Sequence, residues 1–420
     1  MEHITLNNIE HRGTCVSFRF STQGKETSRL FVSNELWIDY GTDMSQVPES
    51  ILTIPFVAFM LPIVWVTDAV LWIRDLDLTF YESCFNLRRA YSELYSKYPL
   101  KGRIVPCKLT ENSLKPSEEA WLLFSGGLDA HTSYIRHQFH ISHLVNIQGW
   151  FRHLGEHSKA AEADRRDISL FAKRNGKQFD YITSNFAILV PPANYRKYAK
   201  AIGDSLWHGF QHSMAFISFT IPLCYKQGCS QIIIASSFTI GDERVCASYP
   251  TTDVEFRFAS AGKTIHDGFE LSRQDKIRVI VDYQKIINAP YPIRVCSFND
   301  TNCCHCEKCF RTIMGLAAEN TNIADFGFNI NKPLLQYYTE YFGNKDNMAQ
   351  FGVRNEALSH WPHIRQRMIE NYEHITRNKD LVDWFLGFDF IKAKHSAVRY
   401  YYAHHFFNIL MRKIKNHVRC

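Results

Sequence analysis

The sequence lacks the features of several broad protein classes. Its 420 residues contain no internal repeat and no low-complexity segment. Charged residues make up only 21% of the chain and leave a net charge of +6, which permits an anionic ligand such as a nucleotide without requiring nucleic acid. With 45% hydrophobic residues, the composition is that of a globular protein with more than one folding unit.

A secretory signal is also missing. Residues 1–8 (Met-Glu-His-Ile-Thr-Leu-Asn-Asn) have neither a basic start nor an apolar run. Twelve cysteines are nevertheless present, and four of them crowd between positions 303 and 309. Clustered cysteines without a signal peptide favour a reducing compartment and metal binding over a disulfide framework. We therefore expect a cytoplasmic protein.

One stretch approaches the length of a membrane span. Residues 50–67 carry no charge and are rich in Ile, Leu, Phe and Val. Pro55 and Pro62 interrupt the stretch, and Asp68 and Arg74 follow it closely. We therefore expect a buried strand and helix in a soluble domain, without a membrane partner.

Three regions are expected along the chain. Residues 1–115 predict an N-terminal α+β domain of unknown role, and residues 321–420 predict a helical C-terminal region. Residues 116–320 alternate apolar strands with helical patterns, which predicts an α/β fold with a doubly wound, mostly parallel sheet. The expected strands are 15–20, 29–40, 121–124, 143–150, 179–183 and 231–235, and the expected helices are 80–95, 130–139, 156–174, 205–226 and 273–287.

The end of the chain combines aromatic and basic residues. Residues 399–420 contain no acidic residue and interleave Tyr and Phe with Arg and Lys. Such a pattern suits contact with RNA or with an anionic membrane surface. We favour the simpler interpretation of a helix that packs its aromatic side chains on the core and keeps its basic groups in solvent.

A strand followed by a glycine-rich turn organises the central region. The apolar run Trp-Leu-Leu-Phe at 121–124 suits a buried strand, and Ser125-Gly126-Gly127-Leu128-Asp129 follows it. Glycines can adopt positive φ and leave room for a ligand beside the main chain, and the start of the next helix adds partial positive charge. The pattern predicts a phosphate-binding turn. A tight strand-to-helix turn that binds no ligand has the same sequence features.

A cysteine knuckle is the strongest local signal. Cys296, Cys303, Cys306 and Cys309 are separated by six, two and two residues, a spacing at which four thiolates can surround one Zn²⁺. Cys304 is then left over. An iron–sulfur cluster remains an alternative for any four-cysteine site, and His305 is a competing ligand. A four-cysteine zinc has no open coordination position, so we expect a structural role.

The turn and the knuckle together resemble those of the PP-loop ATP pyrophosphatases, and within that superfamily those of the 7-cyano-7-deazaguanine synthases. The resemblance covers residues 118–320 and includes a loop at 237–253 that contains Tyr249-Pro250 and Asp253. It implies an enzyme that uses ATP and Mg²⁺, joins a substrate oxygen to the α-phosphate and releases pyrophosphate. In the synthase branch a carboxylate is adenylated, converted to an amide and dehydrated to a nitrile.

The resemblance also implies roles for individual residues. The turn would hold the β- and γ-phosphates, with Ser125 and Asp129 acting in catalysis. Adenine would lie near the strand end at 146–149, which includes Asn146. The second substrate, a purine-like base or a group on a protein partner, would meet Asp242, Tyr249 and Asp253.

Cationic help must come from outside the turn, because the turn lacks the lysine of a Walker A loop. We expect Mg²⁺ to supply part of it. Arg273 and Lys276, at the start of an expected helix, are the candidates for the rest, with Arg273 binding the nucleotide and Lys276 acting in catalysis. A solvated helix face explains the same two residues equally well. His208, His212 and His266 are candidate proton carriers, although lone histidines are more often structural.

Two departures from the family pattern leave other functions open. Ala130 stands where the family motif continues with Ser or Thr, and about 115 residues precede and about 100 follow the matching region. Sulfur transfer to tRNA is one alternative, prompted by Cys304 and the basic C-terminus. A regulatory module that binds nucleotide without turnover is another, prompted by Ala130. A homodimer is compatible with all three functions.

Overall fold

The computed structural model describes residues 1–149, 158–202, 205–241, 245–296 and 299–418. The chain divides into two compact units, Met1–Glu270 and Leu271–Cys420. These units do not coincide with the three expected regions. The N-terminal 115 residues share a unit with the expected nucleotide-binding region, and the cysteine knuckle belongs to the second unit.

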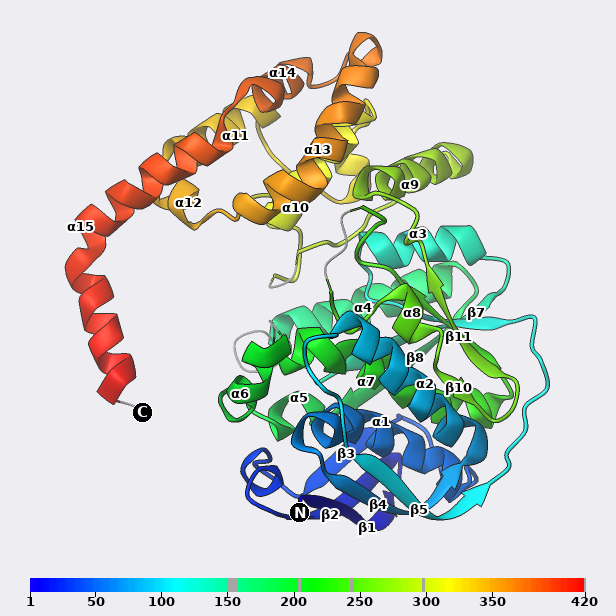
Figure 1. Cartoon of the computed structure of the whole chain (residues 1–420). Coiled ribbons are helices and arrows are strands. Elements are labelled where there is room, and N and C mark those ends of the chain that lie inside the picture. The colour runs from blue at the N-terminus through cyan, green and yellow to red at the C-terminus, as the bar shows by residue number, and fades with distance from the viewer. Residues whose placement is uncertain (150–157, 203–204, 242–244, 297–298, 419–420) are drawn as a thin grey trace. The chain divides into compact units, whose positions relative to one another are not determined.

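The first unit contains all of the strands that the structure describes (Figure 1). The strands are β1 (His3–Arg12), β2 (Cys15–Gln23), β3 (Glu35–Asp39), β4 (Val70–Asp77), β5 (Arg103–Thr110), β6 (Ala120–Leu123), β7 (Ile141–Gln148), β8 (Gln178–Ser184), β9 (Gln231–Ala235), β10 (Arg257–Phe258) and β11 (Gly262–Asp267). The helices are α1 (Glu49–Thr67), α2 (Leu78–Leu94), α3 (Leu128–His137), α4 (Ser158–Arg174), α5 (Phe186–Leu189), α6 (Pro192–Ile202), α7 (His212–Gln227) and α8 (Pro250–Asp253), and a π-helical turn, η4 (Trp207–Gln211), precedes α7.

The strands form one 11-stranded, mostly parallel sheet in the order β10-β11-β9-β6-β7-β8-β3-β2-β1-β4-β5. This confirms the expected α/β class. Strands β11, β9, β6, β7 and β8 are parallel to one another. Within this part the chain first moves from β6 outward to β7 and β8 and then returns to the other side of β6 at β9. The strand order therefore reverses between β6 and β9, which is where open α/β sheets bind ligands at the carboxyl ends of their strands.

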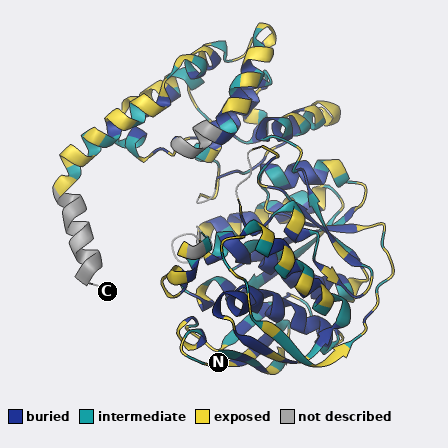
Figure 2. Cartoon of the chain, viewed as in Figure 1, coloured by how far each residue is buried: buried dark blue, intermediate teal, exposed yellow. Residues whose placement is uncertain are grey.

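Helices cover both faces of the parallel part of the sheet. Successive side chains of a strand point to opposite faces, so neighbouring residues enter different cores. Leu122 of β6 and Ile233 of β9 enter a core with α3 and α4. Their neighbours Trp121 and Ile232 enter a larger core that includes α1, α2 and α7. Most of this sheet and the helices on it are buried (Figure 2).

The N-terminal region extends the same sheet and is not a separate domain. Strand β3 pairs antiparallel with β8 through only two residue pairs, Ile38 with Ser184 and Asp39 with Thr183. The pairings of β1, β2, β4 and β5 continue the sheet beyond β3. The expected strand at 29–40 is confined to β3, and residues 27–29 form a 3₁₀ turn.

The apolar stretch at 50–67 forms a single helix, so the expected strand in it is wrong. Pro55 and Pro62 both lie inside α1, and all of its residues from Ser50 to Thr67 are buried. By length and composition α1 is apolar enough to cross a membrane, but its apolar window is fully buried within the protein. An apolar run that is buried on every side carries no periodicity that separates strand from helix.

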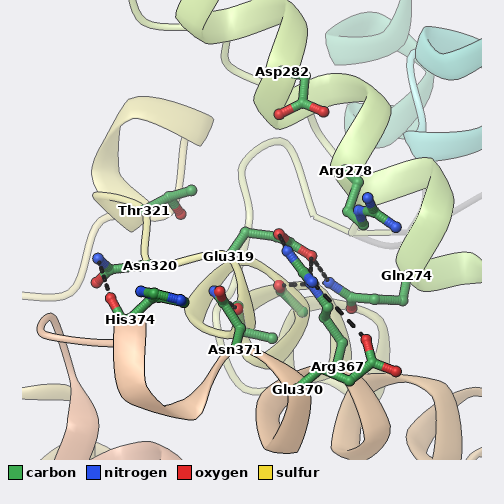
Figure 3. A network of polar contacts seen from close by, with 12 residues as sticks. Gln274, Arg278, Asp282, Glu319, Asn320, Thr321, Arg367, Glu370, Asn371 and His374 are labelled. Carbon is green, nitrogen blue, oxygen red and sulfur yellow. Dashed lines mark hydrogen bonds and ion pairs between the residues drawn. The ribbon is translucent and has the colours of Figure 1, made fainter.

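The second unit is helical. It consists of α9 (Arg273–Ile287), α10 (Glu307–Ala318), α11 (Leu334–Gly343), α12 (Lys345–Gln350), α13 (Arg354–Glu370), α14 (Lys379–Gly387) and α15 (Phe390–Val418). A polar network joins α9, α10 and α13 (Figure 3). At its centre Arg367 donates two hydrogen bonds to Glu319, at 2.9 and 2.8 Å, and Gln274 donates another at 2.8 Å.

We expected the last helix to pack its aromatic side chains on the core, and this expectation holds only in part. Tyr402 and Phe406 are each 57% exposed, so these two rings do not pack on the core as expected. Tyr400 lies beneath the ammonium group of Lys345, at 4.6 Å from nitrogen to ring centroid. The side chains beyond residue 406, which include most of the basic groups, lie outside the described residues.

Candidate functional site

The glycine-rich turn follows β6 as expected and leads directly into α3. Gly126 has φ +72°, a left-handed conformation that favours glycine. Gly127 is the N-cap of α3, and its N–H lies 3.4 Å from Ser125 Oγ as a hydrogen-bond donor. The first N–H groups of a helix have no partner within the helix, so the turn presents donors and the positive end of the helix dipole together.

The neighbouring strand β7 holds the turn in place through Asn146. Its side-chain amide donates to the carbonyl oxygen of Phe124 at 2.9 Å, and its own oxygen accepts from Gln148 at 2.6 Å. At the end of β7, Gly149 has φ +112°, and a Cβ there would lie 1.8 Å from the carbonyl oxygen of Ser184. Only glycine fits at this close approach of two strand ends.

A cavity of about 170 Å³ opens at the carboxyl ends of β6, β7 and β9. It brings together three of the predicted site residues, Ser125, Asp129 and Asn146. Sequence reasoning did not identify the roles of its other polar lining residues, namely Asp164 of α4, Ser237 and Ser248, and His212 was only a candidate proton carrier. The volume is below the roughly 300–1,000 Å³ typical of small-molecule sites, so only part of a drug-sized ligand would fit inside the cavity.

The far side of α3 is anchored to the end of β11. Asp267 accepts hydrogen bonds from Ser133 at 2.6 Å and His137 at 2.8 Å, and the guanidinium of Arg136 lies 3.3 Å away. Burial alone would raise the pKa of Asp267, but the hydrogen bonds from His137 and Ser133 and the charge of Arg136 outweigh it and lower that pKa. The anchor therefore stays ionised and fixes the direction in which α3 points.

His131 of α3 is not an acid at neutral pH. Its ring packs edge-on against Phe124 and Phe171, with centroids 4.9 and 4.8 Å apart. Burial lowers the pKa of His131 to about 3, so the imidazole is neutral. Its role beside the turn is packing.

The expected substrate loop is organised differently from the prediction. Asp253 is fully buried and accepts from the Ser248 hydroxyl at 2.6 Å and from His266 Nδ1 at 2.8 Å. The half-buried Tyr249 caps α8 and packs edge-on against Phe269. Ser248, rather than Tyr249 or Asp253, lines the cavity. The predicted Asp242 lies outside the described residues.

The histidines named as proton carriers have structural contacts. His266 pairs with Asp253, and its side chain is only 2% exposed. His208 accepts the backbone N–H of Ala247 at its carbonyl oxygen, 2.7 Å away. His212 lines the cavity with its Nδ1 3.3 Å from the carbonyl oxygen of Trp207.

Arg273 and Lys276 begin α9 in the second unit. Ser272 caps this helix and forms a capping box with Asp275. Arg273 is 8% and Lys276 is 3% exposed, so the solvated-face interpretation is wrong for both. The Arg273 guanidinium lies 3.4 Å from Thr312 Oγ1 of α10. Their expected action on the nucleotide stays a prediction.

The four predicted cysteines meet at one point in the second unit. The sulfur atoms of Cys296, Cys303, Cys306 and Cys309 all lie within 4.8 Å of one another, and those of Cys303 and Cys309 are 3.9 Å apart. Tetrahedral zinc with Zn–S bonds of about 2.3 Å requires sulfur separations of about 3.8 Å. The group can therefore hold a metal ion such as zinc.

The surrounding backbone is organised to present these sulfurs. Asn302 accepts from the N–H groups of Val295 and Cys296 and donates to the carbonyl oxygens of Ile293 and Gly327. The N–H of Cys306 points to Cys303 Sγ at 3.3 Å, a contact that stabilises a thiolate. Asn302 thus closes the loop whose two ends supply the ligands.

Cys304 is excluded from the group, as the spacing predicted. It is buried in a left-handed conformation with φ +62°, and its sulfur faces the carbonyl oxygens of Asn302 and Asn329. Burial and the adjacent Cys303 raise the pKa of Cys304 to about 11, so it remains a thiol. His305 stacks on Tyr341, 5.4 Å between centroids, and is not among the grouped ligands.

A larger cavity of about 800 Å³ lies elsewhere in the first unit, along β8 and α4. Its polar residues include Asp39, Arg165 and Asp180, and the Arg165 guanidinium covers the Tyr181 ring at 4.8 Å. None of the motif residues lines it. We assign the candidate site to the smaller cavity, because that cavity combines the helix N-terminus with the point where the strand order reverses.

No protein-family model matches this chain, and no curated protein is significantly similar to it. The choice of a function therefore rests on the geometry of the site.

Proposed function

We propose that the protein is an ATP-dependent, AMP- and pyrophosphate-forming enzyme that activates a carboxylate or carbonyl oxygen. The observation that carries this proposal is the position of the Ser125–Asp129 turn. It joins β6 to the N-terminus of α3 beside a cavity where the strand order reverses. In open α/β sheets this is the place for a bound nucleotide.

The described residues suit the binding and cleavage of a triphosphate. Backbone N–H groups at the start of α3 and the Ser125 hydroxyl would hold the oxygens that leave as pyrophosphate, where negative charge develops. Asp129 and Asp164 line the same cavity from two different helices, a pair of carboxyl groups that suits Mg²⁺. Bound Mg²⁺ would neutralise phosphate charge and stabilise the leaving group. The second substrate would be a deazaguanine-like base or a group on a larger partner.

The cysteine group supports this enzyme structurally. Four thiolates around zinc leave no position for a substrate, so the metal would hold the loop ends and the start of α10 together. Sulfur transfer to tRNA is less well supported, because Cys304 is buried and its sulfur faces the carbonyl oxygens of Asn302 and Asn329.

Pyrophosphate and AMP release from ATP with Mg²⁺, measured across carboxylate substrates that include deazaguanine-type bases, tests the proposal. Asp129→Asn and Asp164→Asn should each lower release at least tenfold, since each removes a charge from the cavity. Asp167→Asn is the matched control on α4, because Asp167 forms a local pair with Arg166 at 2.9 Å and should leave release unchanged.

Two results would count against the enzyme. Release that is absent with every substrate, while calorimetry detects ATP binding, would instead support the regulatory module. Release that is unaffected by Asp129→Asn would place the chemistry elsewhere. Ala130→Ser restores the hydroxyl of the family motif at a residue that lines the cavity, and should raise release if Ala130 limits turnover.

A further inference from the structure

We propose that Ser248 is a hydrogen-bond acceptor in the cavity, and that it receives an O–H or N–H donor of the bound nucleotide. Asp253 and His266 are positioning residues that fix the direction of its hydroxyl. This inference deepens the proposed function and rests on ATP being the ligand. It also gives a role to the loop before α8.

The direction of the hydroxyl follows from its partner. Ser248 Oγ lies 2.6 Å from Asp253 Oδ2, and the same oxygen lies 2.8 Å from His266 Nδ1. A carboxylate oxygen only accepts, so Ser248 donates its single proton to Asp253. The Ser248 hydroxyl then keeps its lone pairs to accept a hydrogen bond, and Ser248 lines the cavity. Asp253 is 0% exposed, so it acts through Ser248 without touching a ligand.

Hydrogen bonds to Ala247 fix the backbone beside Ser248. The carbonyl oxygen of Ala247 accepts three hydroxyl groups: Tyr91 of α2 and Ser213 of α7, both at 2.7 Å, and Thr252 of α8 at 3.1 Å. The N–H of Ala247 donates to His208 at 2.7 Å. Connecting segments are usually more mobile than the elements that they join. Here three helices fix the residue that precedes Ser248, and one of them comes from the N-terminal region.

The start of α3 and Ser248 therefore offer opposite hydrogen-bonding partners within one cavity. The start of α3 offers N–H donors, which suit phosphate oxygens. Ser248 directs its proton to Asp253 and therefore offers no donor to a phosphate. A ligand in this cavity must combine an oxyanion with a donor close to it. In ATP the ribose hydroxyls meet this requirement within a short distance, and the 6-amino group of adenine is a more distant donor.

The test pairs changes in the protein with changes in the ligand. Calorimetry would measure the affinities of ATP, 2′-deoxy-ATP, 3′-deoxy-ATP and inosine triphosphate for the wild type and for Ser248→Ala. We expect one analogue to bind the wild type about 3- to 10-fold more weakly than ATP, the value of one neutral hydrogen bond. That difference should disappear in Ser248→Ala. Ser21→Ala, on the exposed side of β2, is the control and should preserve it.

Asp253→Asn tests the positioning role. The variant keeps the Ser248 hydroxyl but replaces the carboxylate, which only accepts hydrogen bonds, by an amide that also donates. The hydroxyl then loses its fixed direction, and the preference for ATP over the same analogue should shrink. A role in folding alone would lower the melting temperature and leave that preference intact. Ser248→Ala removes only one hydroxyl group. It therefore tests whether Ser248 accepts a hydrogen bond from the ligand even if Asp253→Asn fails to fold.

The outcomes separate the inference from the function beneath it. Equal ratios of the four affinities in the wild type and in Ser248→Ala would overturn the role of Ser248 and leave the proposed enzyme standing. Failure of ATP to bind the wild type at all would overturn both.

Discussion

The side-chain amide of Asn146 donates a 2.9 Å hydrogen bond to the carbonyl oxygen of Phe124, the residue that immediately precedes the glycine-rich turn. The resemblance placed Asn146 beside adenine. The structure shows a residue that is 6% exposed and that ties β7 to the end of β6. It holds the residue that leads into the turn, and thereby the direction in which the turn leaves the sheet.

Asn146→Ala should destabilise the protein and weaken nucleotide binding together. The substitution leaves a buried carbonyl oxygen without its donor, which costs about 1–3 kcal/mol. Chemical denaturation gives the loss of stability, and calorimetry gives the affinity for ATP. Asn8→Ala removes an exposed amide that bonds Glu10 and should change neither. Equal stability of the Asn146 variant and the wild type would contradict the role described.

Cys303→Ser and Cys304→Ser form a matched pair for the metal site. Cys303 is one of the four grouped ligands, whereas Cys304 is buried outside the group. Elemental analysis should find one zinc per chain in the wild type and in Cys304→Ser, and much less in Cys303→Ser. A chelator should lower the melting temperature of the zinc-bound forms only. Iron in the protein together with visible absorbance would identify an iron–sulfur cluster instead of zinc. Equal metal content in both variants would show that Cys303 is not a ligand.

Arg367→Ala should be among the most destabilising substitutions in the helical unit. Glu319 is only 6% exposed at its side chain, and Arg367 holds it with two hydrogen bonds (Figure 3). Removal of one partner of a buried ion pair costs about 3–5 kcal/mol, because the other charge stays buried. Arg278→Ala is the control, since Arg278 is 48% exposed and lies 3.6 Å from Asp275. Its loss should cost under about 1 kcal/mol in thermal or chemical unfolding.

Asp180→Asn should stabilise the protein at neutral pH. Burial raises the pKa of Asp180 to about 6, and His143, 4.0 Å away, brings no compensating charge because burial lowers its pKa. The unfolded carboxyl group has a pKa of about 3.9, so the ionised side chain costs the folded state about 3 kcal/mol.

The sign of this effect fixes its pH dependence. The folded protein binds the proton more tightly than the unfolded chain, so the cost is absent below about pH 4, grows to about pH 6 and is constant above it. Unfolding of both proteins across this range should show curves that meet at low pH and separate as the pH rises. A constant difference at every pH would assign the effect to packing.

Local patterns predicted several elements in both units. Strand β9 and helix α9 have the predicted bounds, and β6 and α3 differ from theirs by one or two residues. These elements have clear periodicity or a clear cap. The cysteine spacing likewise predicted the metal group and left Cys304 out, because Cys-x-x-Cys turns bring sulfurs together through local geometry alone.

Several of the errors depend on contacts between separate parts of the chain. Nothing near Asp253 in the sequence reveals that His266, thirteen residues later, would bury it as a structural partner. Strand β11 was not predicted, because its sequence, Gly-Lys-Thr-Ile-His-Asp, is mostly polar. This segment forms a strand through its pairing with β9. The burial of Arg273 and Lys276 is equally a property of the fold and not of their helix.

The junction between β3 and β8 has a consequence for how this protein can be divided. Its strand pairing has two residue pairs, which join residues about 145 positions apart. A fragment that begins at residue 116 would expose β8 as an edge strand and uncover the apolar side of Trp121. Unpaired strand edges and bare apolar faces are templates for aggregation. The half of the unit that contains the candidate site therefore needs the N-terminal strands as a permanent cover, and studies of it call for the full chain.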